Sequence, residues 1–228
     1  MNRLKKQVIV QTLLEDAILP IFCHSDENIA VNILKACIDG GVRAVEFVAR
    51  GKRSIEVFRA IITYRNAHFP KVFVGAGTIY DQQSANVFLR EGADFIVSPV
   101  FSKEIALTCN RQKILWIPGC GTMTEIAEAE SYGGELIKVF PAVSLGPDFI
   151  KNVLGPSPDS CLMASGGIKS EIVEINKWVK AGAACVGLGS DLFPIELIEK
   201  GNFEPITATI KKIVQSIKDK KIPKSINL

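Results

Sequence analysis

The feature that most constrains this chain is a short apolar segment that recurs eight times along its length. Each segment is rich in Val, Ile, Leu and Phe, and most of them end at glycine or proline. This composition favours β-strands, and near-continuous apolar runs are typical of strands that are buried on both faces. The predicted strands span residues 18–23, 44–50, 72–78, 95–99, 114–119, 136–142, 161–167 and 184–190.

Segments with helical spacing separate these strands. Residues 1–16 resemble an amphipathic helix and not a signal peptide, because no small-residue cleavage site follows an apolar stretch. Ser54 and Thr124 have side chains that can cap the helices that begin near them. Further helices are predicted at 26–37, 54–67, 81–91, 103–110, 124–132, 147–154, 170–180 and 204–218.

Alternation of strands with helices calls for parallel strands joined by helical crossovers. Eight such units favour a closed (β/α)8 TIM barrel, an α/β fold, here preceded by an N-terminal helix. An open doubly wound sheet is the alternative, but it is expected to carry a GxGxxG motif after the first strand, and this sequence has none there. No shift in composition divides the chain, so we expect one barrel domain over residues 1–228.

Charge, cysteine usage and hydropathy exclude several classes of protein. A net charge of +3 is too small to indicate nucleic-acid binding. The longest apolar runs are of strand length, far below the ~20 residues that a membrane helix needs. The six cysteines form no CxxC pair, so we expect them to be reduced and the protein to be cytoplasmic. With only two histidines, in unrelated contexts, we expect no metal site.

One predicted strand carries a charge at its centre. Lys138 stands between Ile137 and Val139, and an ammonium is costly in a strand that is buried on both faces. Desolvation favours the neutral amine, which is a usable nucleophile. The alternative is an edge strand with Lys138 in water, and this segment alone favours neither.

The ends of other strands add to this signal, because active sites of such barrels lie at the carboxyl ends of the strands. Glu46 and Arg50 share one face of their strand, and Lys138 and Phe140 share one face of theirs. If both faces point inward, an acid, a guanidinium and an amine meet in one pocket. Alternatively, Glu46 is a surface carboxylate or a structural partner of Lys138, and Arg50 is a solvated residue at a strand end.

Glycines follow the seventh and eighth predicted strands. Phosphate sites in this fold lie at those two positions, where glycine lets backbone N–H groups approach an anion. This location is matched by two segments, Gly166-Gly167 and Gly187 to Ser190. No lysine or arginine lies inside either loop, and Lys169 is the nearest cation.

Taken together, the strand-end motifs resemble those of the 2-keto-3-deoxy-6-phosphogluconate / 4-hydroxy-2-oxoglutarate aldolases, class I Schiff-base enzymes with a (β/α)8 fold. The resemblance extends over about residues 18–190, and the Lys-Val-Phe-Pro-Ala strand is its most specific part. The motifs are Gly40-Gly41-Val42-Arg43 before Glu46 and Arg50, Val74 to Thr78, Val97-Ser98-Pro99, Ile117-Pro118-Gly119, Lys138 to Ala142, Gly166-Gly167-Ile168 and Gly187 to Ser190.

The resemblance implies a role for each matched residue. Lys138 matches the Schiff-base lysine and Glu46 the general acid/base. Arg50 and Thr78 match the groups that hold the pyruvate carboxylate, and Pro99 and Phe140 shape that pocket. The phosphate-binding loops are matched by Ser165, Gly166, Gly167, Gly187, Gly189 and Ser190. The implied enzyme is a cytoplasmic homotrimer of the Entner-Doudoroff pathway without metal or cofactor. It cleaves 2-keto-3-deoxy-6-phosphogluconate to pyruvate and glyceraldehyde 3-phosphate, and 4-hydroxy-2-oxoglutarate is a possible second substrate.

The sequence departs from the family pattern at three positions. Val48 stands where the family often has threonine, Ser165 where it has threonine, and Val143 where many members have glutamate. Two alternatives to the aldolase therefore stay open. One is a phosphate-binding isomerase or decarboxylase with Glu46 or Asp94 as base and no covalent step. The other is a barrel that binds a phosphosugar without catalysis.

Overall fold

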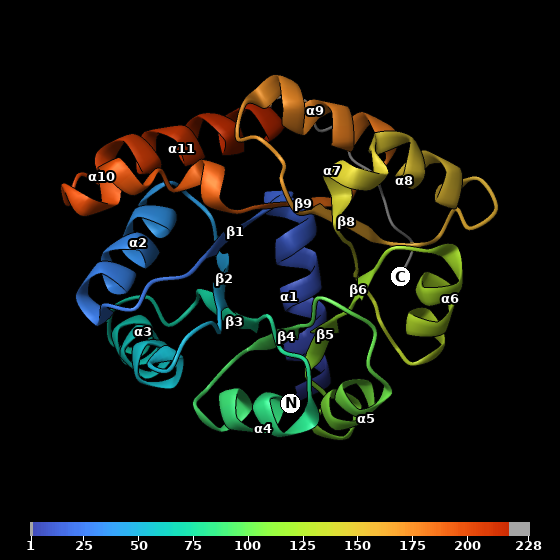
Figure 1. Ribbon diagram of the computed structural model, residues 1–228, viewed down its shortest axis with the longest axis horizontal. Coiled ribbons are helices and arrows are strands. Elements are labelled where there is room, and N and C mark those ends of the chain that lie inside the picture. The colour runs from blue at the N-terminus through green and yellow to red at the C-terminus, as the bar shows by residue number, and fades with distance from the viewer. Residues whose placement is uncertain (1, 219–228) are drawn as a thin grey trace.

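The computed structural model describes residues 2–218, and its strands form one parallel sheet at the centre of the molecule (Figure 1). The strands run in the spatial order β5-β4-β3-β2-β1-β9-β8-β7-β6. They are β1 (Ile18–Phe22), β2 (Ala44–Val48), β3 (Phe73–Gly77), β4 (Phe95–Val97), β5 (Leu115–Ile117), β6 (Gly119–Cys120), β7 (Ile137–Val139), β8 (Leu162–Ser165) and β9 (Cys185–Leu188).

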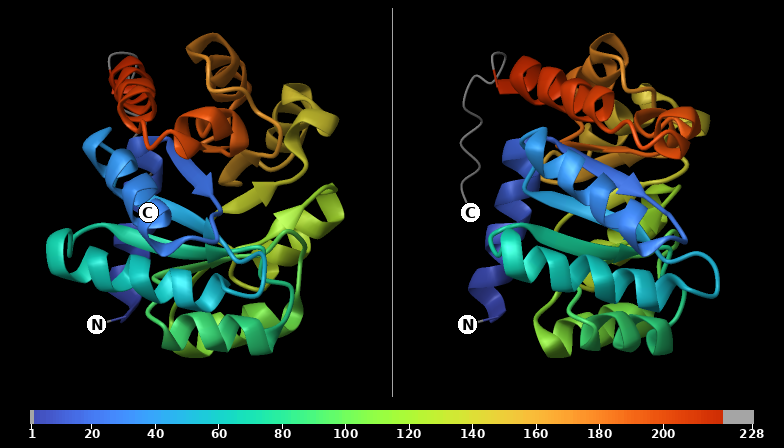
Figure 2. Two further views of the ribbon diagram at one scale, coloured as in Figure 1. Left: turned by 60° about the vertical axis from the view of Figure 1, so that its left-hand side comes forward. Right: turned by 90° about the vertical axis from the view of Figure 1, so that its left-hand side faces the viewer.

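Helices surround this sheet on its outer side (Figure 2). The predicted helices are present, and three short ones that the sequence did not indicate, α7, η1 and α10, follow β7 and β9. None of the helices within residues 2–218 is long and apolar enough to cross a membrane. The helices are α1 (Asn2–Asp16), α2 (Glu27–Asp39), α3 (Ser54–His68), α4 (Gln82–Arg90), α5 (Lys103–Gln112), α6 (Met123–Ser131), α7 (Ala142–Leu145), α8 (Pro147–Leu154), α9 (Ile172–Ala181), η1 (Ser190–Leu192), α10 (Ile195–Glu199) and α11 (Glu204–Lys218).

The sheet closes into a barrel through its fifth predicted strand, which is split in two. β5 pairs with β4, β6 pairs with β7, and only Pro118 separates β5 from β6. Proline has no N–H to donate to a ladder, which explains the interruption. The carbonyl of Pro118 still accepts from the backbone N–H of Lys138 at 2.8 Å. The (β/α)8 barrel is therefore confirmed.

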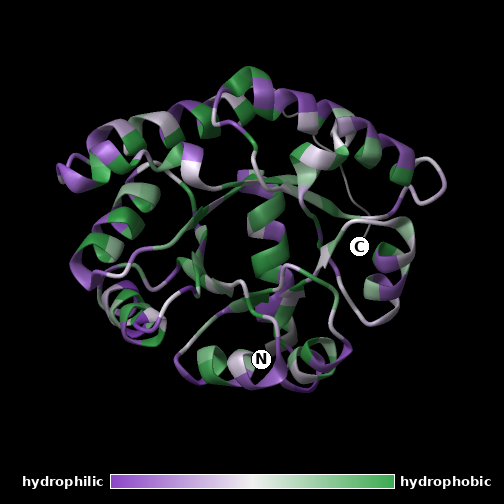
Figure 3. Ribbon diagram, in the orientation of Figure 1, coloured by the Kyte–Doolittle hydropathy of each residue, from purple (hydrophilic) through white to green (hydrophobic). Residues whose placement is uncertain are grey.

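Two apolar cores lie on the two sides of the barrel wall. The larger one fills the space between sheet and helices, so the strands are mostly green in Figure 3, while purple residues gather on the outer helices. The smaller one fills the barrel interior with side chains such as Leu19, Phe95, Leu136 and Met163. Because side chains alternate along a strand, these residues identify the face of each strand that points inward.

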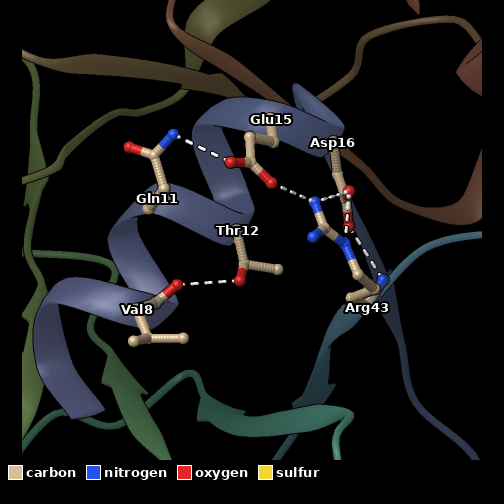
Figure 4. Close-up of polar contacts among 6 residues, drawn as sticks. All are labelled: Val8, Gln11, Thr12, Glu15, Asp16 and Arg43. Atoms are coloured by element: carbon tan, nitrogen blue, oxygen red, sulfur yellow. Dashed lines mark hydrogen bonds and ion pairs between the residues drawn. The ribbon is translucent and has the colours of Figure 1, made fainter. Parts of the chain in front are cut away.

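Helix α1 plugs the amino-terminal end of this interior. Its Ile9 and Leu13 are buried in the interior core, and the helix lies across the barrel behind its opening in Figure 1 and at one end of the barrel in Figure 2. The end of α1 is tied to the start of β2, where Asp16 accepts from the Arg43 backbone N–H at 2.8 Å and from its guanidinium at 2.6 Å (Figure 4). Helix α1 therefore covers the amino-terminal end of the barrel, and the carboxyl end is the side from which we expect a ligand to enter.

Two of the predicted helix caps are wrong in position. The side chain that caps α6 is Thr122, which accepts from the N–H of Glu125, and not Thr124. Ser54 is the first residue of α3, and its predecessor Arg53 makes no side-chain cap. Helix α6 begins slightly earlier than its apolar pattern indicates. Such shifts of a residue or two are common at helix ends, because several polar residues near a boundary can each serve as the cap.

Candidate active site

The inward faces of the strands lose their apolar character towards the carboxyl end of the barrel. Glu46 pairs in register with Ile21 and Gly75, Lys138 with Gly119 and Met163, and Ser165 with Gly187. Each of these residues lies an even number of positions along the chain from a residue of the interior core or one packed against it. Their side chains therefore point into the barrel, beyond that core towards its carboxyl end. The inward positions at this end are Ile21, Glu46, Val48, Gly75, Gly77, Val97, Gly119, Lys138, Ser165 and Gly187.

Lys138 and Glu46 meet inside the barrel. The Lys138 Nζ lies 3.7 Å from Oε1 of Glu46, and the two side chains are 8% and 1% exposed. The same Nζ lies 5.2 Å from the centroid of the Phe140 ring, which forms one wall beside the amine. Lys138 is therefore not a solvated edge residue, and Glu46 is not a surface carboxylate.

The Glu46 carboxyl group is under-satisfied. Neither oxygen accepts a hydrogen bond from any described residue, and 3.7 Å is too long for one with Lys138. Burial of such a group costs stability, roughly several kcal/mol for an ion in a protein interior. A purely structural ion pair is expected to have tighter geometry than this one, because only good geometry offsets that cost. Both Glu46 oxygens are therefore left with hydrogen-bonding capacity that no described residue uses.

Burial is also the main influence on the protonation of Glu46. It raises the pKa of the Glu46 carboxyl, while the positive charges of Lys138 and Arg50 lower it by a smaller amount. A carboxyl group with a raised pKa can hold a proton and release it nearer neutral pH than a solvated glutamate does. This suits Glu46 to exchange protons with a reacting group.

Glycine makes the space that Glu46 occupies. A Cβ at Gly77 would lie 1.9 Å from Oε1 of Glu46, and a Cβ at Gly75 would lie 2.1 Å from the Phe95 ring. Both glycines are on the inward face of β3, beside β2. The sequence placed Gly77 at a strand end but gave no sign that this glycine houses the carboxylate. Only the register of β2 and β3 reveals it.

Arg50, Thr78 and Pro99 lie just beyond β2, β3 and β4, at the rim of the same opening. Arg50 is exposed, and its guanidinium makes no hydrogen bond with any residue in the described part of the chain. Thr78 has φ 62°, a conformation that a β-branched residue rarely adopts. Such strain concentrates at functional sites. The rim therefore holds a cation without a hydrogen-bond partner among residues 2–218, beside a strained hydroxyl residue.

The two glycine loops form the other side of the opening. Gly166 and Gly167 have φ 103° and 78°, so their N–H groups take directions that other residues reach only with strain. No described residue accepts a hydrogen bond from the backbone N–H of Gly166, Gly167, Gly189 or Ser190. Four unpartnered donors at two neighbouring strand ends are suited to an anion.

Tight packing joins the strands that lead into these loops. Ser165 is buried, and a Cβ at Gly187 would lie 2.7 Å from its Oγ. Val143 lies on α7 and is 54% exposed. It packs against Gly167, since a Cβ added at Gly167 would lie 3.2 Å from Cγ2 of Val143. Val48 is buried on the inward face of β2. Both apolar departures from the family pattern therefore border the opening.

Sequence reasoning missed Asp191, which connects the two glycine loops. Its carboxylate receives hydrogen bonds from Lys169 and Ser170 in the loop after β8. The sequence holds only a faint signal for this residue, an aspartate that directly follows the Gly189-Ser190 pair.

Together these groups can act on a small molecule with a carbonyl and two anionic ends. The amine of Lys138 and the acid of Glu46 are at the centre, Arg50 is on one side, and the glycine N–H groups are on the other. Within residues 2–218 no three His, Cys, Asp or Glu side chains are grouped so that they could hold a metal ion.

Comparison with known proteins gives a consistent result. A profile of the KDPG and KHG aldolase family matches residues 9–209. The 2-dehydro-3-deoxy-phosphogluconate aldolase of Pseudoalteromonas atlantica is 31% identical over 198 residues, 86% of this chain and 89% of that protein. The 2-dehydro-3-deoxy-6-phosphogalactonate aldolase of Escherichia coli is 33% identical over 159 residues, 69% of this chain and 75% of that protein.

A solved structure is similar over the same region. It is the KDPG aldolase from Legionella pneumophila, in which pyruvate was captured at low pH as a covalent carbinolamine intermediate. It has a TM-score of 0.80 and 25% sequence identity, and the match covers 89% of this chain and 96% of that one.

Proposed function

The chain belongs to the KDPG and KHG aldolase family, and we propose that Lys138 is the lysine that forms its Schiff base. The protein is a class I aldolase, a carbon–carbon lyase. The observation that carries the proposal is the pair of Lys138 and Glu46, 3.7 Å apart and buried at the carboxyl end of the barrel. Class I chemistry needs an amine nucleophile with a proton-transfer group beside it, and this pair supplies both.

Lys138 carries the covalent steps. Its neutral amine attacks the ketone carbon of a 2-keto acid and gives a carbinolamine, which loses water to form an iminium ion. The iminium accepts electrons when the C3–C4 bond breaks, so the product is an enamine instead of a free carbanion. The Lys138 side chain is buried beside the Phe140 ring, so its amine is held inside the pocket and away from bulk water.

Glu46 moves the protons of these steps. It delivers a proton to the hydroxyl that leaves the carbinolamine, and it removes one from the C4 hydroxyl during cleavage, directly or through a water molecule. The raised pKa of its carboxyl group supports both directions of transfer. Gly77 supports this role because it leaves the space into which the carboxyl group projects.

The rim residues orient the keto acid. Arg50, whose guanidinium has no hydrogen-bond partner among the described residues, binds the substrate carboxylate through two parallel hydrogen bonds. Thr78 adds a hydroxyl on the same side, and Pro99 and Phe140 form apolar walls around the pyruvyl part. A carboxylate fixed in this way sets the ketone carbon within reach of Lys138.

The glycine loops bind the phosphate at the other end of the substrate. We propose 2-keto-3-deoxy-6-phosphogluconate as that substrate, with pyruvate and glyceraldehyde 3-phosphate as products. The similarity to a phosphogalactonate aldolase supports the C4 epimer as a second candidate, and the family description supports 4-hydroxy-2-oxoglutarate as a third. Initial rates on all three acids test the proposal. Faster turnover of the two phosphorylated acids supports it, and equal turnover of the unphosphorylated acid counts against a phosphate site.

The isomerase or decarboxylase alternative with Asp94 as base finds no support. Asp94 precedes β4, at the opposite end of the barrel from Lys138. Its carboxylate is 2% exposed and is already bound by Arg65 at 2.6 Å, by Lys5 at 2.7 Å and by the N–H of Val74 at 2.8 Å. Three donors thus occupy a carboxylate that no substrate in the opening can reach, so Asp94 has a structural role.

Placing a side chain in the phosphate loop is expected to separate the two halves of the site. The variant Gly167→Val should raise KM for the phosphorylated substrate by about tenfold or more, because φ 78° disfavours valine and its side chain meets Val143. Schiff-base formation with free pyruvate should be almost unchanged, since pyruvate has no phosphate. Steady-state kinetics and borohydride trapping measure the two quantities.

The control for backbone strain is Gly201→Val. Gly201 has φ 64° and no atom within 4 Å of an added Cβ, so the conformational penalty is similar while the loops stay intact. Its KM should match that of the unmutated protein. A Gly167→Val variant with unchanged KM would exclude this loop from substrate binding.

The remaining expectations are proposals that rest on membership of the family. We propose that the protein is a homotrimer with a mass three times the 24.8 kDa of one chain. We also propose that its residues 1–228 form one barrel domain and that it works in the cytoplasm on soluble, phosphorylated keto acids.

A further inference from the structure

Asp191 joins the loop after β9 to the loop after β8. Its Oδ1 lies 2.7 Å from Nζ of Lys169, and its Oδ2 accepts from both the backbone N–H and the hydroxyl of Ser170, each at 2.7 Å. The three donors come from the segment that directly follows Gly166 and Gly167. Asp191 itself directly follows Gly189 and Ser190. One carboxylate therefore spans the two sets of unpartnered N–H groups.

The charge of this carboxylate does not fit direct contact with a phosphate. Two anions repel each other unless cations or donors lie between them, and here Lys169 and Ser170 occupy both carboxylate oxygens. The hydrogen bond from Lys169, followed by those from Ser170, lowers the pKa of Asp191 to about 2. The group therefore stays ionised at every pH at which the enzyme is expected to work.

We infer that Asp191 is a positioning residue that fixes the distance between the two glycine loops and so determines the preference for a phosphorylated substrate. This inference rests on the proposed function, in which those loops hold the phosphate. The N–H groups of Gly166 and Gly167 come from one strand end, and those of Gly189 and Ser190 from the next. They bind one phosphate together only while the two loops keep a fixed separation.

A series of Asp191 variants tests this role. Asp191→Ala removes the three carboxylate contacts with Lys169 and Ser170 and leaves only the 3.5 Å contact from the Ser170 hydroxyl to the backbone carbonyl of residue 191. Asp191→Asn keeps an acceptor for Ser170 but loses the charge, and Asp191→Glu restores the charge on a longer arm. KM for the phosphorylated acid should rise about tenfold or more in Asp191→Ala. The increase should be smaller in Asp191→Asn and smallest in Asp191→Glu. The inhibition constant of inorganic phosphate should rise in the same order.

Substrates without a phosphate distinguish a positioning residue from a merely structural one, because only a structural defect would impair them as well. In Asp191→Ala, kcat and KM for 4-hydroxy-2-oxoglutarate and the rate of borohydride trapping with pyruvate should stay within about twofold of the unmutated values. Equal loss on phosphorylated and unphosphorylated acids would overturn the inference. An unchanged inhibition constant for phosphate in Asp191→Ala would also overturn it.

The matched control is Glu174→Ala. Glu174 forms an ion pair with Lys177 on α9, so this variant removes the same charge and one exposed ion pair but no link between loops. Its KM values should not change, and a rise equal to that of Asp191→Ala would assign the effect to net charge. The unmutated protein distinguishes the other failures. If it is trapped with pyruvate but is not inhibited by phosphate, the phosphate site and the role of Asp191 both fail. If it is not trapped at all, the aldolase mechanism fails.

Discussion

Aldol cleavage is expected to disappear when Lys138 is replaced by arginine, with kcat falling by more than about 10⁴-fold. A guanidinium stays protonated in proteins and has no free electron pair for attack on a ketone. Arginine keeps the positive charge beside Glu46, so the electrostatic part of the site is retained while the covalent step is lost. Initial rates on the phosphorylated acid, with detection of pyruvate, measure the effect.

Two further variants exclude trivial explanations of such a loss. Lys138→Met has a side chain of similar length without charge, and it should also be inactive, because it has no amine. Lys35→Arg changes an exposed lysine that pairs with Asp39 on α2, and it should keep full activity. Circular dichroism of each variant reports whether the barrel has formed. Substantial turnover by a folded Lys138→Met would exclude Lys138 as the nucleophile.

The Glu46→Gln variant is expected to lose about 10²- to 10⁴-fold in kcat, the usual contribution of a general acid/base. Glutamine has nearly the same size and fits the space beside Gly77, so the fold should be preserved. It cannot exchange protons, although Lys138 is still present. We therefore expect adduct formation with pyruvate to be slowed and not abolished, and cleavage of the full substrate to be affected more strongly.

The control for this variant is Glu135→Gln. Glu135 precedes β7, at the opposite end of that strand from the opening, and pairs with Lys6 at the surface. Lys6 is 12% exposed and Glu135 45%, so loss of this partly exposed ion pair should cost about 1 kcal/mol of stability and leave kcat unchanged. An unaltered kcat in Glu46→Gln would remove Glu46 from the mechanism and leave it as a buried partner of Lys138.

The sequence could predict the barrel because its strands and helices have simple local signals. Eight apolar segments with helices between them allow few topologies, and the confirmed fold follows from that count. The split of the fifth strand into β5 and β6 was harder to predict from the sequence, although Pro118 lay within the predicted strand. Proline is a known interruption of a ladder, but its effect depended on which neighbours each half pairs with.

Alternation showed which residues share a face of each strand, so the sequence could group Glu46 with Arg50 and Lys138 with Phe140. It did not show which face points inward, and the interior core of the structure settles that. What alternation cannot give is the register between strands. The space that Gly77 leaves for Glu46 depends on the pairing of Val48 with Gly77, and the link from Asp191 to Ser170 depends on how two loops approach each other. Such contacts join residues that are distant in the chain and have no local signal.

The central claim, that Lys138 forms a Schiff base with a keto acid, is tested most directly by covalent trapping in the unmutated protein. The protein is incubated with pyruvate, reduced with borohydride, digested and mapped by mass spectrometry. The account predicts one reduced pyruvate adduct for each chain, on the peptide that contains Lys138, and none when pyruvate or borohydride is omitted. An adduct on an exposed lysine such as Lys35, or no adduct while the protein still cleaves its substrate, would contradict it.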